Sequence, residues 1–391
     1  GPLNVSENKV DREIVEAWLE AAMAAGYRRT VDYNREDQEG VGYFQMTMKN
    51  GRRCSSAAAY LKPARKRSNL HIFTNAHSEK LLIDGNDVTG VRCKIQGKSV
   101  DISARREVIL SAGSIGSPQL LMLSGIGDAA ELRPHGIDVL HHLSGVGKNL
   151  QDHLQARPVF KCRSSTINTE TKNMFQLAAI AFQYVLNRSG PMAMAASLGT
   201  GFLKTHDELE CPDIQFHIQP FSADNPAEGS HKFSAFTASV LQLRPESTGR
   251  ISLRSASPFD RPAIHPNYLA TKTDVDTLVA GIKIARKICD FAPLKNLITE
   301  EYAPGAGVGR DDDNAILDWA RSTATTIYHP TGTCKMGQDD MAVVDNQLRV
   351  HGISNLRVAD ASIMPSITSG NTNAPTIMIG EKVADMILKG A

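Results

Sequence analysis

The chain has 391 residues, more than the length at which a single hydrophobic core usually stops growing, so we expect two domains. Apolar residues make up 41% and charged residues 22%, a composition that excludes a disordered or fibrous chain. The 43 basic residues are balanced by 42 acidic ones, which excludes the strongly basic surface of a nucleic-acid-binding protein. We therefore expect no nucleic acid partner.

The cysteines and the apolar runs indicate the cellular compartment. The six cysteines are widely spaced and form no C-x-x-C pair, which favours free thiols in a reducing compartment.

The sequence also bears on metal binding and on membranes. The histidines at 141, 142 and 153 have no cysteine or carboxylate at ligand spacing, so we expect no metal. The longest apolar stretch, within residues 177–185, is shorter than the ~20 residues that span a membrane. We expect a cytoplasmic protein, with peripheral attachment to the inner membrane as the alternative.

The first elements are a helix and a hairpin. Apolar residues recur at helical spacing over residues 11–25, which predicts an amphipathic helix that ends at Gly26. Residues 42–48 alternate and lead into the turn Asn50-Gly51, which predicts a hairpin before a helix that starts near Ser55.

A small meander and a strand–turn–helix unit follow. The meander consists of four strand-like runs, at residues 70–74, 79–83, 89–95 and 99–102. Residues 107–113 then read as a buried strand that stops at a glycine, and residues 114–123 as a helix. A glycine turn between a strand and a helix N-terminus can cradle a phosphate, so Ser114 is a candidate for cofactor binding.

The pattern changes to α+β between residues 155 and 327. We expect a helix over 174–186, a strand over 213–219, a hairpin made by 235–243 and 250–254, and a helix capped by Thr273. The chain then returns to α/β texture, with a strand at 355–358, a polar loop at 359–373 and a final helix at 375–388.

The last third of the chain contains the histidine with the most informative context. His329 directly precedes Pro330, which disfavours helical backbone and holds the histidine extended in a loop. An extended loop can present the ring to a cavity. The alternative is that His329 only satisfies local backbone groups.

Four motifs occur in one order along the chain. They are GSIGSPQLL at 113–121, GVGKNLQDH at 145–153, YHPTGTCKMG at 328–337 and SGNTNAPT at 369–376. Together they closely resemble the glucose-methanol-choline (GMC) oxidoreductases. Weaker similarity, as in Pro266-Asn267-Tyr268, extends the resemblance over nearly the whole chain.

The resemblance implies a fold and roles for particular residues. It implies FAD as cofactor, His329 as the active-site histidine and Asn371 as its catalytic neighbour. Asp360 and Ala361 match positions that contact the phosphates and ribityl chain of the flavin. The expected cofactor-binding residues are Asp360, Ala361, Ser114, Asn371, Thr372, Pro375 and Thr376. Motif position alone suggests substrate-pocket residues, namely Phe216, His217, Phe221 and Tyr328.

These residue types suit alcohol oxidation on chemical grounds as well. A histidine with a pKa near neutrality can remove the hydroxyl proton. Asn371 can donate a hydrogen bond to the developing alkoxide without titrating. The alternative role for Asn371 is to cap the final helix.

The expected fold is α/β plus α+β, with an incomplete FAD-binding Rossmann-type domain interleaved with an antiparallel-sheet substrate domain. We expect a helix and hairpin at 1–54, part of the FAD-binding domain at 55–154, the substrate-binding domain at 155–327, and a return to the FAD-binding domain with the catalytic loop at 328–391. The family's G-x-G-x-x-G pyrophosphate fingerprint does not occur in these residues. We therefore expect a missing N-terminal segment, with a separate polypeptide as one alternative, and we expect this chain alone to carry little or no FAD.

The functional expectation is an FAD-dependent alcohol dehydrogenase that oxidises a primary alcohol to an aldehyde and passes electrons to an acceptor other than NAD. We expect a neutral primary alcohol rather than choline, which is the less favoured candidate. The aromatic content of 6% suggests no aromatic cage for the quaternary ammonium of choline. Two further alternatives are a flavin-containing hydroxynitrile lyase and a non-catalytic remnant.

Overall fold

The computed structural model describes residues 1–172, 174–224 and 229–390. These residues form two compact units, each assembled from three stretches of chain. Unit 1 comprises residues 1–70, 154–243 and 275–325, and unit 2 comprises residues 71–153, 244–274 and 326–391. Unit 1 thus includes residues 1–54, which we expected to lead into the FAD-binding domain. Unit 2 takes residues 244–274 out of the range that we expected for the substrate domain.

Unit 1 is built on an antiparallel sheet, eight-stranded in the described residues. Its main path runs through β1 (Gly40–Tyr43), β12 (Gly199–Leu203), β13 (Ile214–Gln219), β14 (Ala235–Gln242), β10 (Leu154–Ala156) and β18 (Thr325–Thr326). Two more strands join it at the side, β11 (Val159–Cys162) and β17 (Ile298–Ala303). Strand β14 is buried at every position, as expected for the centre of a sheet that is covered on both faces.

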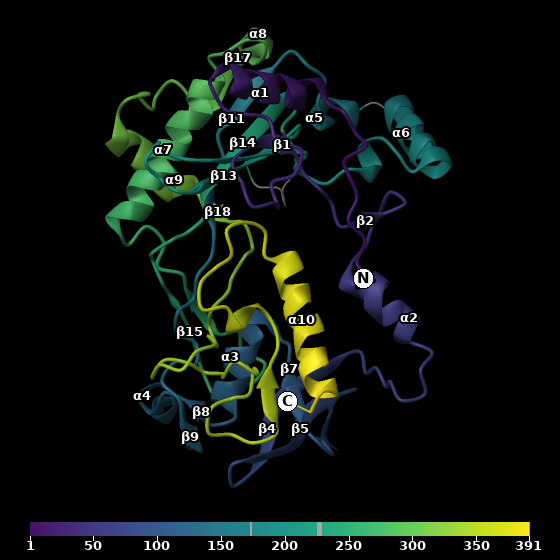
Figure 1. The fold of residues 1–391 in the computed structure, drawn as a ribbon, viewed down its shortest axis with the longest axis vertical. Helices are drawn as coiled ribbons and strands as arrows, with labels where there is room; N and C mark the ends of the chain where they lie inside the picture. The colour runs from purple at the N-terminus through teal and green to yellow at the C-terminus, as the bar shows by residue number, and fades with distance from the viewer. Residues whose placement is uncertain (173, 225–228, 391) are drawn as a thin grey trace. The chain divides into compact units, whose positions relative to one another are not determined.

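The expected N-terminal helix is confirmed as α1 (Glu13–Ala24), which lies across this sheet (Figure 1). Its Trp18 is fully buried, and the Trp18 ring centroid lies 5.6 Å from that of Phe216 on β13. Gly201 allows this approach, because a Cβ there would lie 3.2 Å from the Trp18 ring. Truncating a buried tryptophan typically costs about 3–5 kcal/mol, so this contact is a main anchor of α1.

Further short elements and helices complete unit 1. They are β2 (Met48–Lys49), β3 (Arg52–Arg53), η1 (Ala57–Leu61), α2 (Lys62–Ala64), α5 (Ile167–Glu170), α6 (Met174–Asn187), η3 (Pro191–Ala193), α8 (Leu294–Leu297), α9 (Asp313–Thr323) and most of α7 (Lys272–Ile288). β2 and β3 pair around Asn50 and Gly51, which confirms the expected hairpin. Both turn residues have positive φ, as a tight hairpin turn requires.

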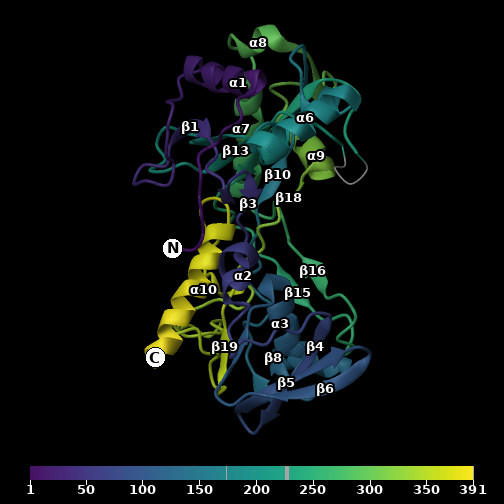
Figure 2. The same ribbon diagram turned by 90° about the vertical axis from the view of Figure 1, so that its right-hand side faces the viewer.

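Unit 2 combines a meander, a parallel pair and two long helices (Figure 2). The meander is β4 (Ala76–Asp84), β5 (Asp87–Ile95) and β6 (Lys98–Ser103). Strand β7 (Val108–Leu110) leads into α3 (Gly113–Leu123) and pairs in parallel with β19 (Leu356–Val358). The final helix is α10 (Asn373–Leu388). The strand–glycine–helix unit expected around residue 113 is thereby confirmed.

The smaller elements of unit 2 surround a shared hydrophobic core. They are β8 (Ile126–Gly127), α4 (Ala129–Leu132), η2 (Arg133–His135), β9 (His141–His142), β15 (Arg250–Ser252), β16 (Ala263–His265) and η4 (Ala361–Ile363). The core brings together Leu121 of α3, Val358 of β19 and Val383 of α10. Residues more than 200 positions apart in sequence thus bury one another, which fixes β19 and the loop after it against α3.

Three sequence-based expectations were wrong. The helix that we expected Thr273 to cap begins at Lys272, and Thr271 Oγ1 accepts from the Asp274 N–H there instead. Residues 70–74 form no strand, and most of them are exposed, so they bury too little apolar surface to hold a place in a sheet. The expected hairpin between 235–243 and 250–254 does not form, because β14 pairs with β13, β10 and β11, whereas β15 pairs with β16. Alternation of apolar residues predicted the strands but not their partners. Among the described residues, no helix has the length and apolar character that crossing a membrane requires.

Candidate functional site

His329 is held in a strained loop of unit 2 that begins at Thr326. Tyr328 has a positive φ of 65°, which is rare for a bulky residue, and its backbone N–H donates to Thr326 Oγ1 at 2.8 Å. The His329 backbone N–H then donates to Asp152 Oδ1 at 2.9 Å. Backbone strain of this kind persists only when surrounding contacts fix the conformation.

The carboxylate of Asp152 anchors this loop through hydrogen bonds. It is buried, and its other oxygen, Oδ2, accepts hydrogen bonds from Tyr268 Oη and Thr326 Oγ1. Burial, with the charge of Asp152 beside it, raises the pKa of Tyr268, so the phenol stays protonated and continues to donate. The three hydrogen bonds offset the free-energy cost of removing the Asp152 carboxylate from water. They also join the chain around Asp152 to Tyr268 and to the loop of Thr326 and His329.

The residues just before Asp152 join two loops. Asn149 Nδ2 donates to the carbonyl oxygens of Gly332 at 3.2 Å and Pro365 at 3.1 Å. Gln151 Nε2 also donates to Pro365 O at 3.1 Å, and Gln151 Oε1 accepts from the Ile367 N–H at 3.1 Å. The segment 149–152 therefore fixes the loop of His329 and the loop that leads to Asn371 against each other.

Both ring nitrogens of His329 face polar partners. Nε2 lies 3.3 Å from Asn371 Nδ2, and Nδ1 lies 3.0 Å from His153 Nδ1. The His329 residue is only 7% exposed. Burial lowers the pKa of His329 below the ordinary 6.5, with the charge of Asp152 acting in the opposite direction. The ring is thus neutral at neutral pH and can accept a proton.

Asn371 lies at the end of the polar loop that precedes α10. The N-cap of α10 is Thr372, and no side-chain cap hydrogen bond is formed there. The amide of Asn371 contacts His329 instead, so the helix-cap interpretation of Asn371 is not supported. The structure thus brings together the two residues that the resemblance named as catalytic.

The candidate cofactor residues cluster at the N-termini of α3 and α10. Asp360 Oδ2 accepts from the Gly113 N–H at 2.9 Å and from Ser117 Oγ at 2.6 Å, and Oδ1 accepts from the Ser362 N–H at 2.8 Å. Ser114 Oγ donates to Pro330 O at 2.7 Å, which links the start of α3 to the loop of His329. Asp360 is therefore a buried structural acceptor at the start of α3.

The remaining candidates lie around the first turn of α10. Thr372 is buried, and its carbonyl oxygen accepts from Thr376 Oγ1 at 2.7 Å, with Pro375 between them in the first turn. Ala361 is half-buried in η4. Neither α3 nor α10 has an acidic residue in its first turn, but the Asp360 carboxylate already accepts from the Gly113 N–H at the start of α3. Of the two helix N-termini, that of α10 therefore suits the negative charge of a pyrophosphate. The residues present fit FAD in this respect.

The four expected pocket residues are divided between the units. Phe216 is fully buried against Trp18, a core position, and His217 packs its ring 4.8 Å from that of Phe44. Phe221 is half-buried in unit 1, whereas Tyr328 belongs to unit 2 and is 80% exposed. Only Tyr328 is next to His329 within one unit.

An aromatic cluster in unit 1 bears on cation recognition. The rings of His231, Phe233 and Tyr302 lie within 5.1 Å of one another, centroid to centroid. The Lys161 ammonium lies 4.9 Å from the centroid of Phe233 and 5.3 Å from that of Tyr302. This cage already holds a cation of the protein's own, so it does not offer an open site for a quaternary ammonium.

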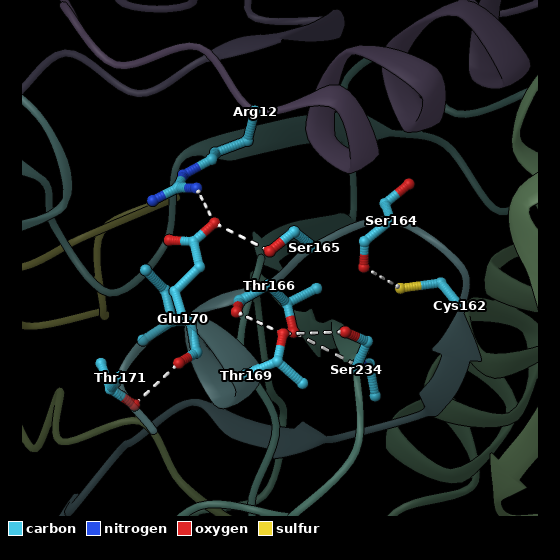
Figure 3. Close-up of polar contacts among 11 residues, drawn as sticks. Arg12, Cys162, Ser164, Ser165, Thr166, Thr169, Glu170, Thr171 and Ser234 are labelled. Carbon is cyan, nitrogen blue, oxygen red and sulfur yellow. Dashed lines mark hydrogen bonds and ion pairs between the residues drawn. The ribbon is translucent and has the colours of Figure 1, made fainter. Parts of the chain in front are cut away.

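A separate cavity of about 540 Å³ lies in unit 1 beside α5 and α6. Figure 3 shows Arg12 and Ser165 both bonded to Glu170, with the ion pair at 2.7 Å. The lining carries Lys9 and Arg12 against Asp11 and Glu170, so its charges compensate. In the described part of the chain it contains no histidine or cysteine, so it has no base comparable to His329.

Sequence reasoning did not assign a role to Asp152, Tyr268, Thr326 or, beyond metal binding, to His153. Asp152 and His153 end the motif at 145–153, and Tyr268 belongs to a stretch already noted for similarity, so those motifs were the signal available. Thr326 had no such signal.

Comparison with known proteins identifies the family of this chain. Models of the GMC oxidoreductase family match residues 1–155 and 245–380. An alcohol dehydrogenase (acceptor) from Pseudomonas putida is 42% identical over 100% of this chain and 71% of its own length. Human mitochondrial choline dehydrogenase is 43% identical over 99% of this chain and 65% of its own length. The chain thus spans about two thirds of the length of these curated relatives. A formate oxidase variant from Aspergillus oryzae, from a study of its FAD modification, superposes with a TM-score of 0.91 at 29% identity, over 99% of this chain and 72% of that one.

Proposed function

The chain belongs to the GMC oxidoreductase family, whose cofactor is FAD, and on that premise we propose that it oxidises a primary alcohol to an aldehyde through His329 and Asn371. The observation that carries the proposal is the contact between the buried ring of His329 and the amide of Asn371, a residue that is exposed. A neutral imidazole nitrogen and an amide donor lie 3.3 Å apart, on two loops that residues 149–152 hold together. That is the pairing of base and hydrogen-bond donor that removal of a hydroxyl proton requires.

The two side chains divide the reaction between them. His329 Nε2 takes the hydroxyl proton while Asn371 donates to the oxygen, which becomes the carbonyl oxygen of the aldehyde. The carbon–hydrogen bond breaks with its electron pair, and FAD, when bound, supplies the acceptor for this hydride. Burial of His329 keeps Nε2 unprotonated, so the base is ready when substrate arrives. The electrons then leave for an acceptor other than NAD.

The substrate that we propose is a neutral primary alcohol. The relatives include choline dehydrogenases, so choline is the competing candidate. The aromatic content of 6% favours the neutral substrate, because a quaternary ammonium is commonly bound by an aromatic cage.

The test follows flavin absorbance in the full-length enzyme after anaerobic mixing with a primary alcohol or with choline. We expect the alcohol to bleach the flavin. Replacing His329 with Ala should slow bleaching by about 10²- to 10⁴-fold, the range for loss of a general base, with FAD still bound. Asn371→Ala should cost less, about 3 kcal/mol, as for loss of one preorganised donor.

Other outcomes identify the alternatives. Faster bleaching by choline than by the alcohol would make the protein a choline dehydrogenase. Bound flavin that no alcohol bleaches, with cleavage of a cyanohydrin, would indicate a lyase. A His329→Ala enzyme with an unchanged rate would remove His329 from the chemistry.

We also propose that the protein resides in the cytoplasm and attaches to the inner membrane through α6. This helix exposes its large apolar residues, with Phe175 88% and Phe182 66% exposed, and has no charged residue. Lys172 and Arg188 flank it. Tyr184 Oη donates to Gly51 O in the β2–β3 hairpin, whose Arg52 and Arg53 are exposed. An apolar helix with basic neighbours suits an anionic lipid surface.

Sedimentation with vesicles tests this location. The full-length enzyme should pellet with vesicles containing phosphatidylglycerol, and Phe175→Ser with Phe182→Ser should remain in the supernatant. Val31→Ser, at another exposed apolar position of unit 1, is the matched control and should pellet like the unaltered enzyme. Equal pelleting of all three would contradict a role for α6.

A further inference from the structure

Unit 2 contains a second histidine in direct contact with His329. His153 is fully buried, and its Nδ1 lies 3.0 Å from Nδ1 of His329. The two rings are nearly perpendicular, at 79°, so they meet through their edges rather than their faces. The backbone holds His153 in place, because the Ile327 N–H donates to its carbonyl oxygen at 3.0 Å and Asp152 precedes it.

The contacts of His329 determine where its proton lies. Asn371 Nδ2 can only donate, so His329 Nε2 must accept in that contact. A neutral imidazole whose Nε2 accepts has its hydrogen on Nδ1. His329 Nδ1 therefore donates to His153 Nδ1, and His153 has its own hydrogen on Nε2.

We propose that His153 is a positioning residue that fixes the tautomer of His329, so that the Nε2 lone pair is directed toward Asn371 and the substrate hydroxyl. This inference rests on the proposed function of His329. Without an acceptor at Nδ1, the hydrogen of His329 could move to Nε2, and the ring would then present a donor where the reaction needs a base. In the alcohol complex the long 3.3 Å contact is replaced, with the hydroxyl donating to Nε2 and accepting from Asn371.

His153 also supports the state formed when His329 is protonated. The imidazolium has a hydrogen on both nitrogens, and only the one on Nδ1 faces another ring nitrogen. A hydrogen bond from a charged donor is stronger than a neutral one, so the His153 contact strengthens as the proton arrives. Asp152 does not fill this role, because its carboxylate bonds the His329 backbone rather than the ring.

Two replacements of His153 separate positioning from packing. His153→Leu fills a similar volume and removes the acceptor. His153→Asn places an amide oxygen close to where Nδ1 lies, so it can still accept from His329. We expect His153→Leu to slow flavin reduction by about 10- to 100-fold, the range for partners that orient a functional histidine, and His153→Asn to recover most of the rate. His142→Leu, at an exposed histidine of unit 2, is the control and should leave the rate unchanged.

A direct readout of the tautomer does not depend on turnover. Long-range ¹H–¹⁵N spectra of the full-length enzyme labelled on histidine nitrogens, recorded well above the ordinary histidine pKa, show which nitrogen holds the hydrogen. The His329 signals are assigned by their loss in His329→Ala. His142 Nδ1 accepts from the Ala129 N–H at 3.2 Å and is an internal reference for the opposite tautomer. We expect hydrogen on Nδ1 of His329 in the unaltered enzyme and in His153→Asn, and a shift toward Nε2 in His153→Leu.

Different results would contradict the positioning role of His153 and the proposed catalytic role of His329. Hydrogen on Nε2 of His329 in the unaltered enzyme, or the same tautomer and rate in His153→Leu, would overturn the role of His153. The expected tautomer shift together with full activity of His329→Ala would uphold the positioning of the ring and overturn the proposed function.

Discussion

At the scale of the residue, the environment of His329 decides its protonation. Burial disfavours the imidazolium and lowers the pKa, and the nearby charge of Asp152 offsets part of this effect. The base therefore remains neutral over a wider pH range than an exposed histidine would. The backbone bond from His329 to Asp152 fixes the position of the ring at the same time.

The lowered pKa predicts the pH dependence of the reaction. Only neutral His329 can accept the hydroxyl proton, so kcat/KM should be constant on the neutral side and fall on the acid side at a pH below 6.5. Asp152→Asn removes the charge that raises this pKa, so its acid limb should lie at still lower pH. Steady-state kinetics across the acid range measures both, and an acid limb above 6.5 would contradict the buried, neutral base.

The lowered pKa of His329 also makes the stability of the folded chain depend on pH. The folded chain holds the proton of His329 less tightly than the unfolded chain does, since its pKa is lowered. The contribution of this group to stability is therefore complete above pH 6.5 and is lost as the pH falls from there through the folded-state pKa.

At the scale of the element, residues 149–153 act as a strand-like connector between two loops. Asn149 and Gln151 bond the loop of His329 on one side and the loop of Pro365 and Ile367 on the other. Backbone bonds between Gln151 and Thr331, at 3.1 and 2.8 Å, reinforce the first connection. The distance between His329 and Asn371 thus depends on one short segment rather than on either loop alone.

Gly332 lies against this connector, in a place with no room for a larger side chain. Its φ is +88°, and an added Cβ would lie 2.5 Å from the carbonyl oxygen of Asn149. Gly332→Ala should cost about 1–3 kcal/mol from backbone strain alone and push the two segments apart, so both the melting temperature and the rate of flavin reduction should fall. Gly337→Ala, in the same loop, meets its nearest atom at 3.3 Å without a positive φ and should be tolerated. Equal behaviour of the two variants would contradict this account.

The start of α3 depends in a similar way on Asp360. Its carboxylate is an acceptor for Gly113, Ser117 and Ser362. Asp360→Ala leaves these donors without their acceptor, at about 1–3 kcal/mol for each donor that stays buried, so flavin occupancy should fall together with thermal stability. The control is Asp385→Ala, an exposed partner of Lys389 on α10, which should keep its flavin. Full occupancy with lost turnover in Asp360→Ala would move Asp360 into the chemistry.

At the scale of the whole molecule, unit 2, which contains the candidate cofactor residues, has little parallel sheet. In the described residues, β7 and β19 form a two-stranded parallel sheet, and Ile109 in the middle of β7 is 42% exposed. Parallel sheets are normally covered on both faces, and their strands are buried. The N-terminus of α10 suits a pyrophosphate, but the family's glycine fingerprint for it does not occur in these 391 residues.

The isolated 391-residue chain should therefore bind little FAD. We expect its absorbance to show substoichiometric flavin, and we expect it to associate through the exposed β7 surface. Adding, as a second polypeptide, the part of a relative that this chain does not match should restore flavin absorbance and reduce association. Absorbance and size-exclusion chromatography measure both effects. A monomeric chain with stoichiometric FAD and no second polypeptide would show that the glycine fingerprint is not needed here.

The sequence by itself determined the local structure and the chemical type of the protein. The helical spacing of apolar residues predicted α1, and the Asn50-Gly51 turn predicted the first hairpin. The pattern of residues 107–123 predicted strand β7 and helix α3. Four ordered motifs gave the family. Each of these depends on residues that are close together in the chain, where backbone preference and side-chain periodicity act directly.

Only the tertiary structure decided which distant residues meet. His153 and His329 are 176 positions apart, and Asp152 and Tyr268 are 116 apart, yet one contact holds the ring of His329 and the other the carboxylate that bonds its backbone. The same is true of β14 and β15, which the alternation identified as strands but paired wrongly. Partners at such separations are chosen by the packing of the whole core, because burying each polar group requires a matching donor or acceptor from another part of the chain. The sequence could therefore name His329 as the candidate base, but the fold was needed to show that His153 contacts its ring.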